Sequence, residues 1–285
     1  MALHGYLIER YNNMAGSYTC YRLMEEAAIQ GVDLQLIGIE DTYIQDGVLY
    51  NNGMRMQPCD FVINRFKIGK LREQINALAR RTYNPSDAFA RYINKYDQVR
   101  TLHSDEFIIP QYILSTTSCG YETLASHLGA PFVAKGLESS MGREIFLIKR
   151  EEDLTSLQKQ FGSTKEWLFE EFIAESKGRD VRLFAIRDTA IAAMIRKSED
   201  DFRANVALGA SVESIELTPA IQQIAKDIYT ITHLDFVGID LLFGKDKFYL
   251  CEINVMPGLE GIEKASGVNI SRQIIETIRK DFSNE

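Results

Sequence analysis

The sequence predicts a mixed α/β (α+β) protein whose N-terminal and C-terminal parts are built differently. In the first part, an apolar strand at residues 6–8 is followed by a helix pattern and then by the strands VDLQLIGI and DFVINR. In the second part, strands come in pairs joined by short turns. Strand, helix and strand in succession are typical of a small α/β domain, whereas closely spaced strands form hairpins. We therefore expect an N-terminal α/β domain at residues 1–82 and a second region at 83–285.

Local patterns define the elements of the first part. Its helix buries one face, because Cys20, Leu23, Met24, Ala27 and Ala28 recur at helical spacing, and Gly31 ends it. The polar stretch QDGVLYNNGMRM carries an Asn-Gly turn signal and is expected to form a hairpin. The segment RTYNPSD is expected to be a linker, because the residue before a proline disfavours helix and the serine can cap a new one.

The second part begins with a helix expected at residues 86–101 and then alternates strands with three further helices. The helices are expected at about 121–127, 151–162 and 219–234, the last capped by Thr218 with Pro219 in its first turn. A final helix is expected from Asn269. The strands are PQYIL, two strands in APFVAKGLESSMGREIFLIKR, EWLFEEFI, DVRLFAI, TAIAAMIR, FVGIDLLF and KFYLCEINV.

Composition excludes several classes of protein. A net charge of −8 argues against nucleic-acid binding, which requires a basic surface. No apolar run approaches the roughly 18–20 residues needed to cross a bilayer, and no signal peptide is indicated, so we expect no membrane association. The four cysteines stand far apart without a CxxC pair, which favours reduced thiols and a cytoplasmic location.

Polar residues in the last strand pair suggest a metal site. Leu250, Glu252 and Asn254 are expected on one face of their strand, with Cys251 and Ile253 on the other. If the hairpin loop has an odd length, such as 245–247, Asp240 faces Glu252. Opposed carboxylates repel unless a cation joins them, and an all-oxygen ligand set suits Mg²⁺. Taken alone, the pattern favours a solvent-exposed polar face over a metal site.

Further polar residues interrupt apolar strands. Lys135 stands in the middle of PFVAKGL, where an ammonium group needs an anion, although a lysine that extends to the surface is an equal alternative. Arg203 and Asn205 stand two apart in DFRAN, and Glu171 ends a strand shortly before Asp180. Each of these signals is modest by itself.

Together, these residues resemble the ATP-grasp enzymes, and most closely the ribosomal-protein glutamate-ligase (RimK-like) branch. The likeness covers most of the chain and is densest from Pro131 to Gly267. It depends on the order of Lys95, Lys135, Glu171, Phe172, Asp180, DFRAN, Asp240 and EINVMPGLEGIEKASG. By this resemblance, two subdomains with antiparallel sheets hold ATP between them. The lid subdomain would span about 118–170, and the catalytic subdomain about 171–285.

The resemblance also assigns roles to individual residues. Lys95 and Lys135 would contact the phosphates, Glu171 with Phe172 the adenine, and Asp180 the ribose side. Arg203 and Asn205 would lie near the terminal phosphate, with Arg203 as the catalytic residue. Asp240, Glu252 and Asn254 would hold Mg²⁺, with Mn²⁺ as a substitute. The flap at 138–144, which lies within LESSMGRE, has only one glycine, unlike the glycine-rich flap of many relatives.

The expected activity is an ATP-dependent carboxylate–amine ligase. It would form an amide or peptide bond through an acylphosphate, with an amino acid such as glutamate as one substrate and a small molecule, peptide or protein as the other. The family also implies a homo-oligomer, either a dimer or a tetramer. The sequence leaves two alternatives open, a phosphotransferase acting on a hydroxyl and a nucleotide-binding regulatory module without turnover.

Overall fold

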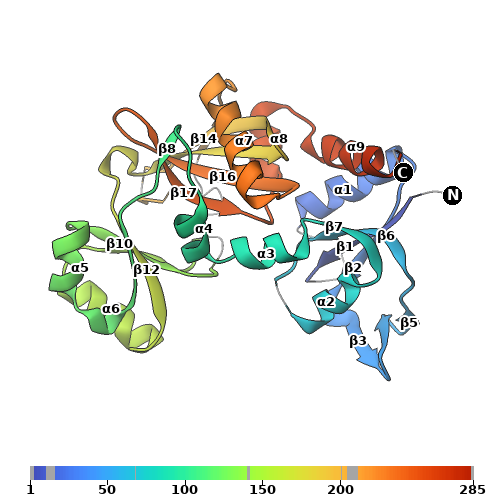
Figure 1. The fold of residues 1–285 in the computed structure, drawn as a ribbon, viewed down its shortest axis with the longest axis horizontal. Coiled ribbons are helices and arrows are strands. Elements are labelled where there is room, and N and C mark those ends of the chain that lie inside the picture. The colour runs from blue at the N-terminus through green and yellow to red at the C-terminus, as the bar shows by residue number, and fades with distance from the viewer. Residues whose placement is uncertain are drawn as a thin grey trace.

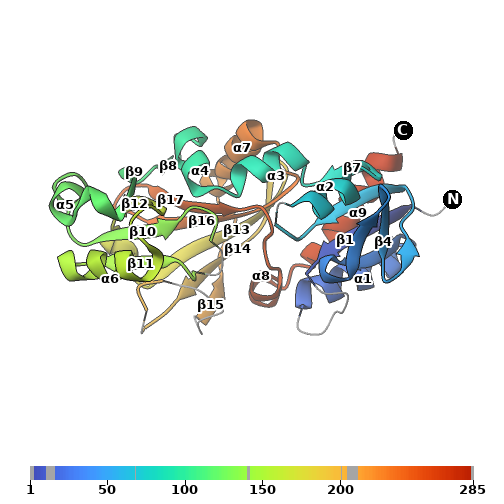
Figure 2. The same cartoon turned by 90° about the horizontal axis from the view of Figure 1, so that it is seen from below.

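The computed structural model describes residues 3–10, 17–67, 69–139, 142–199, 201–203 and 211–283. These residues form three parts that lie in a row (Figures 1 and 2). We call them the N-terminal domain, the lid and the catalytic part, after the expected subdomains, and the sheet of the catalytic part lies between the other two. Within the described residues, no helix is both long and apolar enough to span a membrane.

The N-terminal domain contains an all-parallel sheet in the strand order β2-β1-β6-β7. The expected linker RTYNPSD was wrong in its first residues, because β7 continues to Tyr83 as the fourth strand of this sheet. The expected hairpin is a three-stranded sheet, β3-β4-β5. Its two turns place Asp46-Gly47 and Asn52-Gly53 at positive φ, which hairpin turns of the I′ type require. The elements are β1 His4–Glu9, α1 Tyr18–Ile29, β2 Asp33–Gly38, β3 Thr42–Gln45, β4 Val48–Asn51, β5 Met54–Arg55, β6 Cys59–Asn64, α2 Lys70–Asn76 and β7 Ala79–Tyr83.

The connection to the second part consists of two short helices instead of the single helix expected. These are α3 Ser86–Tyr92 and α4 Lys95–Thr101. The helix is interrupted at Asn94, whose side chain accepts a hydrogen bond from the backbone amide of Tyr96 at 2.9 Å and so caps α4. This cap makes Lys95 the first residue of α4.

The lid is an antiparallel sheet in the order β11-β10-β12-β9, covered on one face by two helices. Its core includes Phe132, Ala134, Trp167 and Phe169, which lie on alternate positions of β10 and β12. The opposite face of both strands therefore points away from this core. The elements are β9 Tyr112–Thr116, α5 Tyr121–Leu128, β10 Phe132–Gly136, β11 Ile145–Ile148, α6 Glu151–Phe161 and β12 Glu166–Glu171.

The catalytic part is a six-stranded sheet in the order β15-β14-β13-β16-β17-β8. Its pairs are antiparallel except for β17 with β8, a two-residue strand that the sequence patterns did not indicate. Val181, Leu183, Ile239 and Leu241 pack on one face with α7. Helix α9 leaves this part and packs beside α1 of the N-terminal domain (Figure 1). The elements are β8 Phe107–Ile108, β13 Arg179–Ile186, β14 Thr189–Lys197, β15 Ser211–Ser214, α7 Pro219–Thr232, β16 Phe236–Phe243, β17 Phe248–Asn254, α8 Glu260–Ser266 and α9 Ile270–Ser283.

Candidate active site

The face of the catalytic sheet opposite its apolar core carries paired charges. Asp240 on β16 stands directly across from Arg182 on β13 and from Glu252 on β17. Asp180, two residues before Arg182 and so on the same face, stands across from Arg196 on β14. Four neighbouring strands thus bring these side chains to one surface.

A β-bulge, not the loop length, puts Asp240 and Glu252 on the same face. The hairpin loop has four residues, 244–247, so the expectation of an odd loop was wrong. The register shifts at Cys251, the extra residue between the pairs Leu241–Leu250 and Asp240–Glu252. The shift also overturns the expected face of Leu250, which packs in the apolar core with Ile253.

Two arginines hold Asp240. Arg182 donates Nε to Oδ1 and Nη2 to Oδ2, both at 2.6 Å, and Arg196 Nη2 lies 2.9 Å from Oδ2. Arg196 also grips Asp180 with a two-bond fork at 2.6 and 2.7 Å. Burial disfavours the charge of Asp240, but the arginines outweigh burial and lower its pKa to about 2. Asp240 is therefore an oriented, ionised carboxylate.

The lid sheet presents a lysine–glutamate pair towards the bulge. Lys135 Nζ lies 2.6 Å from Oε2 of Glu170 and donates to the carbonyl oxygen of Cys251 at 3.0 Å. Burial disfavours the charged lysine, but its acidic neighbours outweigh burial and raise its pKa. Among the described residues, Oε1 of Glu170 has no hydrogen-bond partner although it is buried.

The sequence patterns do not indicate Glu170 as a site residue and point to its neighbour Glu171 instead. Side chains alternate along β12, so Glu170 faces Lys135 while the carboxylate of Glu171 accepts a hydrogen bond from the Gln111 amide at 2.8 Å. The signal was present, because Glu170 shares a strand face with Leu168, opposite the strand position of Lys135. Pairing two strands 35 residues apart was needed to use it.

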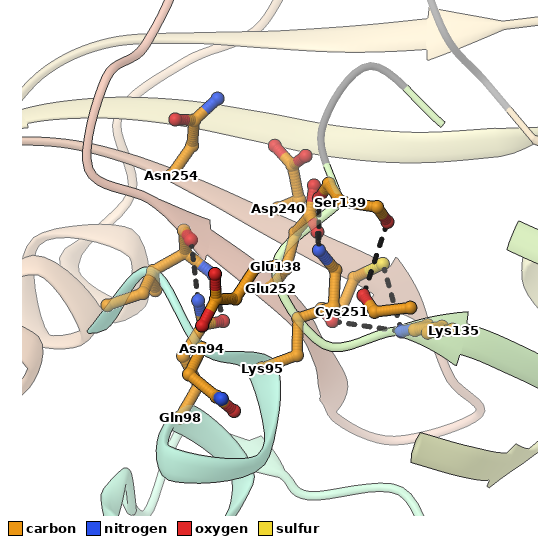
Figure 3. Close-up of polar contacts among 12 residues, drawn as sticks. Asn94, Lys95, Gln98, Lys135, Glu138, Ser139, Asp240, Cys251, Glu252 and Asn254 are labelled. Carbon is orange, nitrogen blue, oxygen red and sulfur yellow. Dashed lines mark hydrogen bonds and ion pairs between the residues drawn. The ribbon is translucent and has the colours of Figure 1, made fainter. Parts of the chain in front are cut away.

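Lys95 joins the catalytic sheet to the flap, as Figure 3 shows. Its ammonium lies 3.2 Å from Oε2 of Glu252 and donates to the carbonyl oxygen of Ser139 at 2.6 Å. Lys95 is buried, whereas the Glu252 side chain is 24% exposed. Lys95, Lys135, Glu252 and Glu170 therefore meet between the two sheets.

The remaining residues chosen from sequence are placed as follows. Arg203 donates to both carboxylate oxygens of Asp201 and to the carbonyl oxygen of Gly142 in the flap at 2.7 Å. The ring of Phe172 contacts Phe202 edge-on at 6.3 Å between centroids. Asn254 Oδ1 accepts from the Met256 amide at 2.9 Å. Asn205 lies outside the described residues.

The donor set suits a hard divalent cation beside phosphate. Two carboxylates and an amide, from Asp240, Glu252 and Asn254, come from adjacent strands with oxygen donors only. Within the described ranges, no group of three or more His, Cys, Asp and Glu residues is placed to hold a metal ion. A metal that takes few protein ligands and completes its shell with phosphate oxygens, as Mg²⁺ does, fits this set.

Known proteins resemble this chain over most of its length. The family model of the RimK-like ATP-grasp domain matches residues 93–278. The chain belongs to the RimK-like ATP-grasp family. It is 31% identical to a probable alpha-L-glutamate ligase from Stenotrophomonas maltophilia, over 92% of this chain and 94% of the relative. It is 28% identical to one from Haemophilus influenzae, over 92% and 93%.

Solved ATP-grasp ligases share the fold. The ligase PsnB, complexed with a minimal precursor, matches with a TM-score of 0.73 and 16% identity, over 98% of this chain and 99% of that one. The D-alanine–D-alanine ligase of Bacillus anthracis, complexed with ATP, matches with a TM-score of 0.69 and 14% identity, over 98% and 99%. The expected ATP-grasp fold is confirmed, and this RimK-like chain is an ATP-dependent carboxylate–amine ligase.

Proposed function

We propose that this ligase uses Mg²⁺ and ATP to activate a carboxylate as an acylphosphate, which an amine then attacks to form an amide. An amino acid such as glutamate is one substrate, and a peptide, a protein or a small molecule is the other. The relatives named probable alpha-L-glutamate ligases support glutamate. The observation that carries the proposal is the meeting of two buried lysines with Asp240 and Glu252 between the two sheets.

In this proposal, each group between the sheets has a task. Lys95 and Lys135 bind the phosphates, because ammonium groups suit phosphate oxygens. Oε1 of Glu170 accepts a hydrogen bond from the adenine amino group, since a buried carboxylate oxygen without a donor is costly. Glu171 and Phe172 remain predicted to border the adenine, and Asp180 to lie on the ribose side.

Asp240, Glu252 and Asn254 hold Mg²⁺, which when bound neutralises charge on the phosphates. Arg203 stabilises the charge on the transferred phosphoryl group, because a guanidinium fork matches phosphate oxygens. Its contact with the Gly142 carbonyl ties it to the flap that borders the phosphates in this proposal. Asn205 is proposed to assist it.

Other features of the chain also remain proposals. We propose an N-terminal domain at 1–82 and an ATP-grasp region at 83–285, with the lid at about 118–170 and the catalytic subdomain at about 171–285. A cytoplasmic location and a dimer or tetramer are proposed as well.

The test is incubation with ATP, Mg²⁺ and separate pools of amino acids and peptides, followed by mass spectrometry. We expect an amide product together with ADP and phosphate. A phosphorylated product would show that the reaction is phosphotransfer to a hydroxyl and not ligation. Absence of ADP with every pool would favour a regulatory nucleotide-binding module.

A further inference from the structure

Two carboxylates that face each other across the β16–β17 ladder are held in different ways. Asp240 is 3% exposed and receives three short contacts from the forks of Arg182 and Arg196. Glu252 is more exposed, and among the described residues its carboxylate has one cationic contact, with Lys95 at 3.2 Å. Asp240 is thus fixed by groups of its own sheet, whereas Glu252 is neutralised by a residue from α4.

Lys95 has two partners that belong to opposite sides of the proposed nucleotide site. Its ammonium touches Glu252 on the catalytic sheet and the Ser139 carbonyl in the flap (Figure 3). A phosphate and a metal ion at this site would compete with those contacts. The phosphate would compete for Lys95, and the metal for Glu252.

We propose that Lys95 takes the place of the metal ion beside Glu252 when no ligand is bound. Binding of the metal then frees Lys95 for the phosphate, and binding of the nucleotide frees Glu252 for the metal, so that each ligand favours binding of the other. This inference rests on the proposed function, because it assigns Lys95 to the phosphates and Glu252 to the metal. A metal ion alone must approach Glu252 against the adjacent ammonium. Nucleotide alone draws Lys95 away and leaves Glu252 unpaired beside phosphate, where like charges repel.

Binding of the two ligands together exchanges one ion pair for two. Lys95 then neutralises phosphate, and the metal neutralises Glu252. By thermodynamic linkage, the factor by which nucleotide strengthens metal binding equals the factor by which metal strengthens nucleotide binding. Asp240 does not contribute to this exchange, because its arginines lie on strands of the same sheet and stay in place.

The experiment measures Mn²⁺ affinity by electron paramagnetic resonance, without nucleotide and with the β,γ-imido analogue of ATP. Lys95→Met removes the charge at similar length. We expect it to strengthen Mn²⁺ binding without nucleotide by about five- to tenfold, and to reduce the coupling between Mn²⁺ and the analogue by a similar factor. Lys95→Arg keeps the charge and should leave Mn²⁺ affinity without nucleotide near that of the wild type.

Lys135→Met is the matched control. Lys135 faces the same site but contacts Glu170 and Cys251, not Glu252. Its loss should weaken the ATP analogue and change Mn²⁺ affinity by less than twofold. An equal gain in Mn²⁺ affinity in both methionine variants would show a general electrostatic effect and would overturn the proposal. Unchanged or weaker Mn²⁺ binding in a folded Lys95→Met protein would overturn it as well.

Glu252→Gln separates this inference from the proposed function. If Glu252 is a metal ligand, this variant loses Mn²⁺ binding both with and without the analogue. Wild-type Mn²⁺ affinity in Glu252→Gln would remove the metal assignment itself. Loss of binding in Glu252→Gln, together with no gain in Lys95→Met, would leave the assignment intact and reject only the stand-in role of Lys95. Circular dichroism and thermal melting verify folding of each variant.

Discussion

The catalytic sheet and the lid sheet each bury charges on the face opposite an apolar core. The two sets differ in whether every buried carboxylate oxygen has a partner. On the catalytic sheet, the guanidinium forks of Arg182 and Arg196 occupy both oxygens of Asp180 and Asp240. On the lid sheet, Lys135 reaches one oxygen of Glu170 and leaves the other buried without a partner in the described structure.

The difference separates charges that are already balanced within the fold, among them the proposed metal ligand Asp240, from charges that a ligand is needed to balance fully. An arginine fork fixes both partners in one geometry and satisfies a carboxylate, whereas a lysine is a point charge with rotatable donors. A buried oxygen without a donor costs free energy that a ligand N–H can recover. We therefore expect mutations of Arg182 and Arg196 to reduce mainly the stability of the protein. Mutations of Lys135 and Glu170 should reduce mainly nucleotide binding.

The largest expected effect is on stability. Arg196→Met leaves two buried aspartates short of a partner, so we expect the free energy of unfolding to fall by about 3–5 kcal/mol. Chemical denaturation measures it. The control is Arg272→Met, which breaks an exposed contact with Glu276 on α9 and should change stability little. Similar midpoints for the two variants would show that the arginine–aspartate set does not support the fold.

The next effect is on rate. Arg203→Ala should slow substrate-dependent ADP release by about 10²–10³, or about 3–4 kcal/mol of transition-state stabilisation, while ADP binding stays within a few-fold. Steady-state kinetics and a titration with ADP measure both quantities. Lys197→Ala, at an exposed pair with Glu213, is the control. Near-normal turnover in folded Arg203→Ala would reduce the residue to a structural partner of Asp201.

A smaller effect concerns nucleotide binding at the lid. Lys135→Ala should weaken ATP binding by about 1.5–3 kcal/mol and adenosine binding much less, because the lost contact is a charged one to phosphate. Isothermal titration calorimetry with both ligands measures the difference. Lys135→Ala combined with Glu170→Gln shows whether the unpaired glutamate alone causes the loss. Equal weakening of ATP and adenosine in both variants would indicate a folding role.

The last effect is the pH dependence of stability. The pKa of Asp240 is about 2 in the folded protein and about 4 in an unfolded chain, so its contribution is present above pH 4 and is lost as the pH falls towards 2. Over that interval, wild type should lose about 2 kcal/mol more than Asp240→Asn. Denaturation curves at several pH values test this, and parallel pH profiles for the two proteins would contradict it.

Much of the fold could be predicted because local patterns specify it. Helical spacing in α1 and the Asn-Gly turn between β4 and β5 depend on residues close in sequence. Local patterns were not sufficient to predict the structure where a segment pairs with a strand that is distant in the sequence. The first three residues of the expected linker, Arg81, Thr82 and Tyr83, belong to β7 because they pair with β6, a contact that no local pattern predicts.

The sequence alone determined which kinds of groups the candidate site could contain, namely lysines that the family resemblance assigns to phosphate and oxygen ligands that suit a hard cation. It did so because residue type and order along the chain are read directly from the sequence. Only the tertiary structure decided the partners. The bulge at Cys251 turned Glu252 towards Asp240 despite an even loop, and strand pairing brought Arg182 to Asp240 and Glu170 to Lys135. Charges buried together must pair, and these two pairs, Arg182–Asp240 and Lys135–Glu170, are 58 and 35 residues apart, beyond the reach of any local pattern.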